Sequence, residues 1–455
     1  MDKTDQMSTE RISRLLLKFS LPAIIGLLVN ALYNIVDSIF VGRGVGELGL
    51  AGVTVCFPIV TIFIAFIMWI GMGASALISI RLGEKKQGEA EKIVGNALGF
   101  FIIAGLVLTV FGLVYLEEIL VLFGASSNVA PYATDYLRII LSGSVLLAVG
   151  TGMNNFIRAE GNPRMAMNTM LIGTVTNIVL DYIFIFIFKW GIKGAAAATI
   201  ISYAVTSSWV LYYFLRGNSV LKIEINNLVF KKPIIAGIAK LGFPTFIIQV
   251  TSSIQHLILN RSLARYGGDL ALAIIGVIMS ITAFLVLPAM GISQGAQPII
   301  GFNKGAGQYD RVKNTLEMGL VSATLLITVG FVVSKIWPAQ LIGLFNKNPQ
   351  LIEQGVEAMD IFFKLIPLVG VQMLGSSYFQ AVGKANEATI LGLSRQVLIF
   401  IPLLLILPRY WGLAGVWWSS PLSDLGAFIL TGAWLLFELR ELGRAAQPVD
   451  EVYAE

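Results

Sequence analysis

The sequence predicts an all-α integral membrane protein with twelve transmembrane helices in two pseudo-symmetric six-helix bundles. Hydrophobic residues make up 56% of the chain and charged residues only 13%, and the mean hydropathy is +0.79. A soluble domain carries about 25% charged residues, so this chain has too few to cover a water-facing surface. Apolar runs of roughly 20 residues, long enough to span a bilayer core, recur from Leu15 to Phe437. These runs must form helices, because open strand edges leave backbone groups unpaired in lipid.

Glycine, proline and charge clusters divide the apolar sequence into twelve predicted spans. Their approximate ranges are 15–42, 51–80, 94–116, 131–157, 165–188, 194–215, 235–262, 270–302, 312–334, 351–382, 387–408 and 412–438. Residues 1–14 form a polar N-terminal segment without the features of a cleavable signal peptide. The first span is therefore expected to serve as an uncleaved insertion signal.

Landmarks in the first half of the chain recur in the second half. The sequence KFSLP at 18–22 returns as KLGFP at 240–244, a shift of 222 in residue number. The same shift relates LF at 122–123 to LF at 344–345 and RAEG at 158–161 to QAVG at 380–383, and a shift of 221 relates WGIKG at 190–194 to WGLAG at 411–415. Each half holds six spans, an even number, so both halves enter the membrane from the same side and the repeats are parallel. Such duplication in an apolar chain is typical of transporters whose halves move about a central site.

The repeat sets the predicted domain organisation. A cytoplasmic segment at 1–14 precedes an N-lobe at 15–215, a cytoplasmic linker at 216–233, a C-lobe at 234–440 and a cytoplasmic tail at 441–455. Within the linker, residues 223–230 form either a short amphipathic segment or a plain loop. About two thirds of the 32 Lys and Arg residues fall on the side of the termini, which predicts that both termini are cytoplasmic.

Composition also excludes several kinds of site. The single cysteine, Cys56, excludes an intrachain disulfide and a cysteine metal cluster, and the single histidine, His256, argues against a histidine metal site. The net charge of +5 reflects topology, and we expect no nucleic-acid partner. A membrane enzyme would need a nucleophile–base or metal constellation, yet the chain has no HExxH or GxSxG motif.

Two carboxylates lie deep inside predicted spans of the N-lobe. A charge at such a depth costs about 2.5–3.5 kcal/mol, so each one calls for a partner or a function. Asp37 has Tyr33 four residues before it on the same helical face, and Asp181 has Asn177 in the same relation. Thr199 adds a hydroxyl in the sixth span. These groups suit a proton relay or a small hard cation such as Na⁺, although the aspartates could instead only hydrogen-bond to neighbouring helices.

The second half lacks equivalent carboxylates. Leu259 occupies the position that corresponds to Asp37. The seventh span instead carries a neutral polar stripe at helical spacing, formed by Gln249, Ser252, Ser253, His256 and Asn260. This stripe either lines a substrate cavity or hydrogen-bonds to other helices. His256 titrates near neutral pH, so it is a candidate proton carrier, with a structural role as the alternative.

The remaining charges inside spans are expected to form structural ion pairs. Arg395 in the eleventh span is predicted to pair with Asp424 in the twelfth. Arg138 is predicted to pair with Asp135, and Lys364 with Asp360, each about one helical turn away.

Three stretches of this chain resemble the MATE family (multidrug and toxic compound extrusion). They are LPAIIGLLVNALYNIVDSIFVG at 21–42, RAEGNP at 158–163 and TNIVLD at 176–181. The resemblance extends over essentially all twelve spans, and within the family the chain is similar to the MepA-like branch of bacterial and archaeal proteins. It implies a V-shaped pair of six-helix lobes in the cell membrane of a prokaryote.

The resemblance also implies a function and a site. Members export amphipathic, often cationic drugs or dyes by antiport with H⁺ or Na⁺, so we expect no cofactor other than the coupling ion and a monomer surrounded by membrane lipids. The cation-coupling residues of the family correspond to Asp37, Asn177, Asp181 and Thr199, with Tyr33 adjacent. The resemblance also places a helix bend at Pro22.

One departure from the family and two alternatives accompany this prediction. One branch places acidic residues in spans seven and ten, where this chain has Gln249 and no mid-span carboxylate, so a cation site in the C-lobe is not expected. A lipid-linked oligosaccharide flippase of the same superfamily is the alternative, although such proteins tend to have fourteen spans and a strongly cationic cavity. A passive channel or receptor would transport without regard to an imposed ion gradient.

Overall fold

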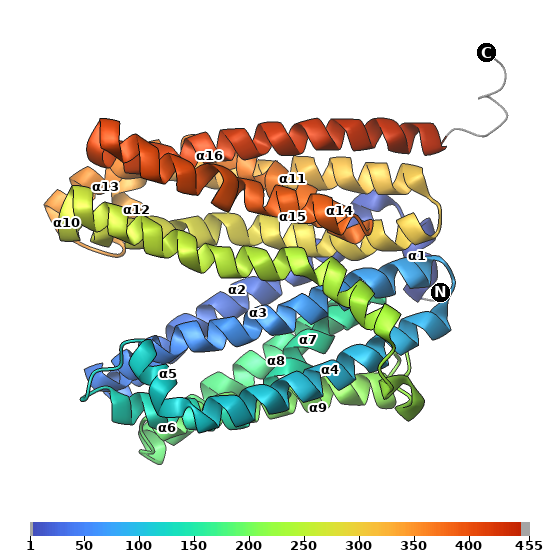
Figure 1. The fold of residues 1–455 in the computed structure, drawn as a ribbon, viewed down its shortest axis with the longest axis horizontal. Coiled ribbons are helices and arrows are strands. Elements are labelled where there is room, and N and C mark those ends of the chain that lie inside the picture. The colour runs from blue at the N-terminus through green and yellow to red at the C-terminus, as the bar shows by residue number, and fades with distance from the viewer. Residues whose placement is uncertain (1–2, 447–455) are drawn as a thin grey trace. The chain divides into compact units, whose positions relative to one another are not determined.

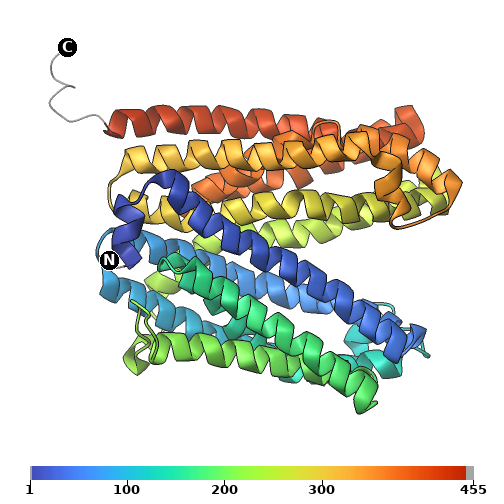
Figure 2. The same cartoon turned by 180° about the vertical axis from the view of Figure 1, so that it is seen from behind.

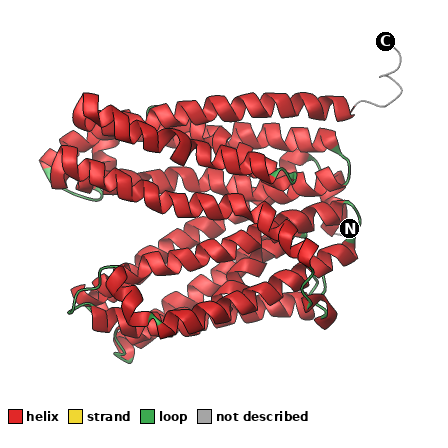
Figure 3. Cartoon of the chain, viewed as in Figure 1, coloured by secondary structure: helices red, strands yellow, loops and turns green. Residues whose placement is uncertain are grey.

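The computed structural model describes residues 3–446, which are helical almost throughout and contain no β-strand in that range (Figures 1 and 3). They divide into two compact units: residues 1–7 with 25–242, and residues 8–24 with 243–455. The helices of each unit run side by side, as the view from behind also shows (Figure 2). The all-α fold predicted from composition is confirmed.

The helices and helical turns follow each other in chain order. From the N-terminus to the linker they are α1 (Lys3–Thr9), α2 (Ile12–Gly44), α3 (Glu47–Gly83), α4 (Gln87–Val114), α5 (Leu116–Leu122), α6 (Ala130–Ser142), α7 (Ser144–Ala159), α8 (Pro163–Asp181), η1 (Tyr182–Ile187), α9 (Ile192–Leu215) and η2 (Ile225–Leu228). They continue with α10 (Lys232–Gly305), α11 (Tyr309–Ile336), α12 (Pro338–Gly343), α13 (Pro349–Phe362), η3 (Ile366–Leu368), α14 (Val369–Ala381), α15 (Ala385–Leu393), η4 (Ser394–Phe400) and α16 (Ile401–Ala446).

These elements account for twelve spans in the described part of the chain. Eight helices are long and apolar enough to cross a membrane, and two bent pairs, α6–α7 at 58° and α13–α14 at 46°, raise the number to ten. Two of the ten are double, because the backbone leaves helical geometry at Gly268 inside α10 and at Gly412 inside α16. The predicted spans 131–157 and 351–382 are thus bent helices, a feature that hydropathy does not reveal.

The backbone repeats between the halves as the sequence does. Gly46 and Gly268, which the shift of 222 relates, both have positive φ (96° and 64°). Gly191 and Gly412, which the shift of 221 relates, share φ of 58° and ψ near −135°. Because a side chain strains the backbone at such angles, glycine permits the sharp reversal before spans two, six, eight and twelve.

The core of the first unit joins α2, α3, α5, α6 and α9. Its buried members include Val41, Cys56, Phe63, Leu137 and Ala196. Small residues bring the helices close together elsewhere in this unit: a Cβ on Gly152 of α7 would lie 2.2 Å from the Phe101 ring of α4. Tight helix packing of this kind relies on small residues, since lipid supplies no hydrophobic drive between helices.

The linker is anchored on the first unit. The Asn96 side chain of α4 donates to the carbonyls of Asn227 (3.1 Å) and Val229 (3.2 Å), and its oxygen accepts from the Lys231 amide at 2.8 Å. Residues 225–228 form a short 3₁₀ turn and not an amphipathic α-helix. The linker is therefore an ordered turn held by α4.

A buried carboxylate fixes the chain after α9. Glu160, which is fully buried, accepts hydrogen bonds from the Tyr213 hydroxyl, from Ser219 Oγ at 2.6 Å and from the Val220 amide at 3.2 Å. These donors satisfy the charge that burial would otherwise make costly. The RAEG sequence at 158–161 thus serves to position the segment that leads into the linker.

The loop after α3 carries an ion-pair cluster. Glu84 lies 2.6 Å from Arg81 and 3.0 Å from Lys86. Burial disfavours the charged carboxylate, but hydrogen bonds from Lys86 and Arg81 together outweigh it and hold the pKa of Glu84 below its ordinary value.

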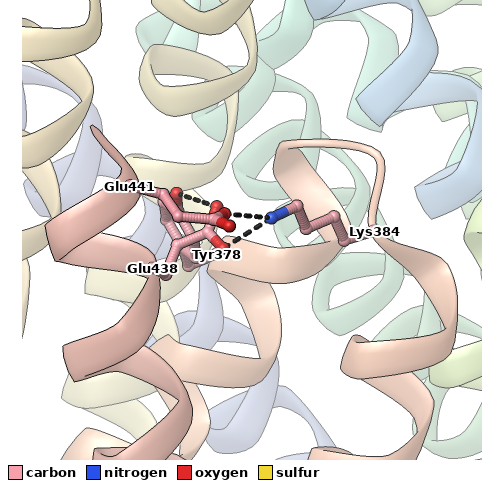
Figure 4. A network of polar contacts seen from close by, with 4 residues as sticks. All are labelled: Tyr378, Lys384, Glu438 and Glu441. Carbon is pink, nitrogen blue, oxygen red and sulfur yellow. Dashed lines mark hydrogen bonds and ion pairs between the residues drawn. The ribbon is translucent and has the colours of Figure 1, made fainter. Parts of the chain in front are cut away.

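In the second unit, one predicted ion pair is confirmed. Arg395 Nε donates to Asp424 Oδ1 at 2.6 Å, and the Asp424 side chain is only 1% exposed. A second network lies after α14, where Lys384 points toward Glu438 (2.5 Å) and Glu441 (3.5 Å), and the Tyr378 hydroxyl donates to Glu438 at 3.0 Å (Figure 4).

The other two predicted ion pairs are wrong. Asp135 pairs with Lys193 at 3.3 Å and not with Arg138. Asp360 pairs with Lys335, and Lys364 instead lies 4.9 Å from the Trp418 ring. In both cases a neighbouring element presents a lysine to the aspartate. Spacing along one helix cannot reveal such a partner, because it depends on how helices pack.

Candidate cation site in the first unit

The site is built around the end of α8. Asn162 caps this helix by accepting from the Met165 amide at 3.3 Å, and Pro163 occupies the first turn, where its missing N–H costs nothing. Asn177 and Asp181 then lie one turn apart on the same face, 1% and 0% exposed. The helix widens into the π-turn η1 directly after Asp181. Such turns are frequent at functional sites.

Asn177 connects Asp181 to α9. In the orientation that satisfies its amide, the nitrogen donates to Asp181 Oδ2 at 2.6 Å and the oxygen accepts from Thr199 Oγ1 at 3.3 Å. Thr199, 3% exposed, lies 3.0 Å from the Ala195 carbonyl. The structure therefore brings three of the predicted site residues into one hydrogen-bonded chain.

Asp37 reaches the same place from α2. Its carboxyl group lies within hydrogen-bonding reach of the Asp181 carboxyl group. The Oδ1 atoms of both aspartates are buried and have no hydrogen-bond partner within the described residues. Two acidic groups in contact, each with one unused oxygen, form a polar centre enclosed by otherwise apolar helices.

Three tyrosines surround this pair. Tyr33, Tyr136 and Tyr203 all interact electrostatically with Asp37. The sequence predicts Tyr33 from its place one turn before Asp37, but it does not single out the other two. Tyr203 lies four residues after Thr199 on α9, so helical spacing could have identified it, but Tyr136 comes from α6 and only the packing reveals it.

Pro22 lies on α2 about four turns before Asp37, and it is buried. A proline inside a helix cannot donate to the carbonyl four residues earlier, here that of Lys18, so the helix is weakened at this point. The predicted bend point thus sits on the helix that carries one of the two carboxylates.

The predicted cavity residues belong to the second unit. Gln249, Ser253, His256 and Asn260 are exposed along one face of α10. Ser252 of the same stripe is half-buried and donates to Gln396 Oε1 at 3.2 Å. The stripe divides accordingly: one serine hydrogen-bonds to the η4 turn, and the other four polar groups are accessible.

Comparison with known proteins places this arrangement in context. The chain is 28% identical to the multidrug export protein MepA of Staphylococcus haemolyticus over 94% of each chain, and 27% identical to MepA of Staphylococcus aureus over 91% of each. The structure of the MATE multidrug transporter DinF-BH in complex with rhodamine 6G has a TM-score of 0.88 and 40% identity, covering 95% of this chain and 97% of that one. A MOP superfamily transporter from Pyrococcus furiosus has a TM-score of 0.90 and 26% identity, covering 96% and 98%.

A family model gives the most direct assignment. The MatE model matches twice, at residues 22–183 and 244–406, once in each half of the chain. The two matches begin at Pro22 and Pro244, the positions that the internal repeat relates. The chain therefore belongs to the MatE family.

Proposed function

We propose that this protein is a secondary active multidrug exporter, which moves amphipathic, often cationic compounds out of the cell by antiport with a cation. The relatives named multidrug export protein and the neighbour solved with rhodamine 6G support this class of substrate. In this proposal the protein is a multi-pass monomer of a bacterial cell membrane with both termini cytoplasmic. The two units alternate access to the substrate.

The Asp37–Asp181 pair is the observation that carries the proposal. Two ionised carboxylates cannot hydrogen-bond to each other, so the contact between them requires a proton on one of the two. This favours H⁺ as the coupling ion. Na⁺ remains the alternative, because the free Oδ1 atoms and the Asn177 and Thr199 oxygens are hard ligands of the kind that Na⁺ accepts.

Loss of the shared proton supplies the mechanical step. Two like charges in contact inside a low-dielectric bundle repel each other strongly. The repulsion acts on α2 through Asp37, and Pro22 gives this helix a place to bend. Protonation removes the repulsion and lets α2 return, so each proton that enters and leaves drives one conformational cycle. The exposed groups of Gln249, Ser253, His256 and Asn260 would supply neutral hydrogen-bonding partners to the drug.

Transport of rhodamine 6G by the protein in proteoliposomes tests this proposal. Export should follow an imposed pH gradient, and Asp37→Asn or Asp181→Asn should abolish it. Asp269→Asn, at an exposed aspartate of the second unit, is the matched control and should export normally. Export driven by a sodium gradient alone would assign Na⁺ instead of H⁺. Full export by Asp37→Asn, or export that ignores both gradients, would refute the coupled mechanism.

A further inference from the structure

A cavity of about 270 Å³ in the second unit is lined by three arginines. Arg261 and Arg265 lie one turn apart on α10, and Arg409 comes from α16. The two helices meet here, since a Cβ on Gly267 would lie 2.8 Å from a methyl carbon of Leu413. The cavity therefore lies beside the reversals at Gly268 and Gly412.

The positive charge in this cavity is not neutralised by acidic residues. None of the three arginines forms an ion pair with a carboxylate within residues 3–446. Arg265 lies 5.6 Å from the Tyr266 ring, and Asp269 is exposed beyond the kink and does not line the cavity. Three guanidinium groups with free donors match the oxygens of a phosphate group well.

The repeat shows that this cavity corresponds to the surroundings of the cation site. Leu259 and Leu403 occupy the positions that correspond to Asp37 and Asp181, and their neighbours Ile258 and Leu404 line the cavity. The second unit has thus lost both carboxylates and carries arginines one to two turns away. The duplicated site has reversed its charge, so it suits an anion.

Exposed side chains next to the cavity indicate its depth in the membrane. Tyr410 and Trp411, directly after Arg409, are 79% and 55% exposed, and such aromatic residues favour the level of the lipid headgroups. Leu405 and Ile406, one turn deeper, are also half exposed and suit acyl chains. We propose that the cavity binds the phosphate of an anionic phospholipid, with an acyl chain along Leu405. The apolar lining beside the arginines fits an amphiphile better than a small soluble anion.

Native mass spectrometry of the full-length protein with phosphatidylglycerol or phosphatidylcholine tests this inference. The wild-type protein should retain phosphatidylglycerol more tightly, and each arginine replaced by glutamine should weaken retention about fivefold. The triple variant R261Q/R265Q/R409Q should bind both lipids equally. Arg43→Gln is the matched control, because Arg43 is the repeat equivalent of Arg265 but lies in the first unit, outside the cavity.

Three results would overturn the proposal. The first is unchanged phosphatidylglycerol retention by the triple variant. The second is binding of inorganic phosphate to lipid-free wild type as tight as that of phosphatidylglycerol, which would make the cavity a soluble-anion site. The third is a triple variant with normal lipid binding and altered export of anionic compounds, which would make it a substrate site. If the triple variant does not fold, Arg409→Gln alone must show the fivefold loss.

Discussion

Replacing Arg395 by methionine should destabilise the second unit more than any change to its partner Asp424. The two side chains are joined by one 2.6 Å hydrogen bond, and Asp424 is 1% exposed while Arg395 is 27% exposed. Asp424 Oδ2 is buried without any hydrogen-bond partner in the described residues. The aspartate consequently depends on the arginine for its charge, whereas the arginine can reach other polar surroundings.

The expected energies follow from this asymmetry. Arg395→Met leaves a buried carboxylate uncompensated, which costs about 3–5 kcal/mol. Asp424→Asn keeps a neutral acceptor for the partly exposed arginine, so it should cost about 1 kcal/mol. The double variant R395M/D424L removes both charges and should lie within about 1 kcal/mol of the wild type, because apolar replacement of a buried pair is close to neutral.

The free energy of unfolding in mixed detergent micelles, titrated with sodium dodecyl sulfate, measures these differences. Arg138→Met is the control, since Arg138 is exposed and has no ion pair in residues 3–446. Equal losses for Arg395→Met and Asp424→Asn would refute the reasoning. So would a double variant as unstable as Arg395→Met alone, because the cost would then come from packing and not from the unpaired charge.

Three further predictions concern stability. The depressed pKa of Glu84 means that its ion pairs stabilise the fold above the ordinary pKa of a glutamate and lose this effect as the pH falls through the folded value; Glu84→Gln should thus be less stable than wild type at about pH 7 and equal to it near about pH 3 in thermal melts, and an equal gap at both values would contradict this. Lys384→Met should cost about 2 kcal/mol, because it removes the cation from Glu438, whose side chain is 6% exposed; Lys384→Arg, which keeps the charge, should cost less in the same detergent titration. Gly152→Ala should cost about 1–3 kcal/mol, because the added methyl would overlap the Phe101 ring, and unchanged unfolding would show that the ring moves freely.

Much of the candidate site could be predicted from local spacing. Asn177 and Asp181 share a helical face because they are four residues apart, and the cost of a carboxylate in the membrane singled out Asp37. Tyr136 escaped prediction because a buried tyrosine in an apolar helix is ordinary by itself. It gains meaning only from the packing of α6 against the helices that carry the aspartates.

Hydropathy and periodicity along the chain are enough to predict the spans, their duplication and the confinement of buried carboxylates to one half, because these properties are local. Which side chains meet is a property of the packed helices. Packing brings Asp37 to Asp181, pairs Asp135 with Lys193, and gathers three arginines beside the reversals of α10 and α16. Each of these contacts joins residues on different helices, and the rotation and approach of packed helices depend on many side chains at once, so no single stretch of sequence contains them.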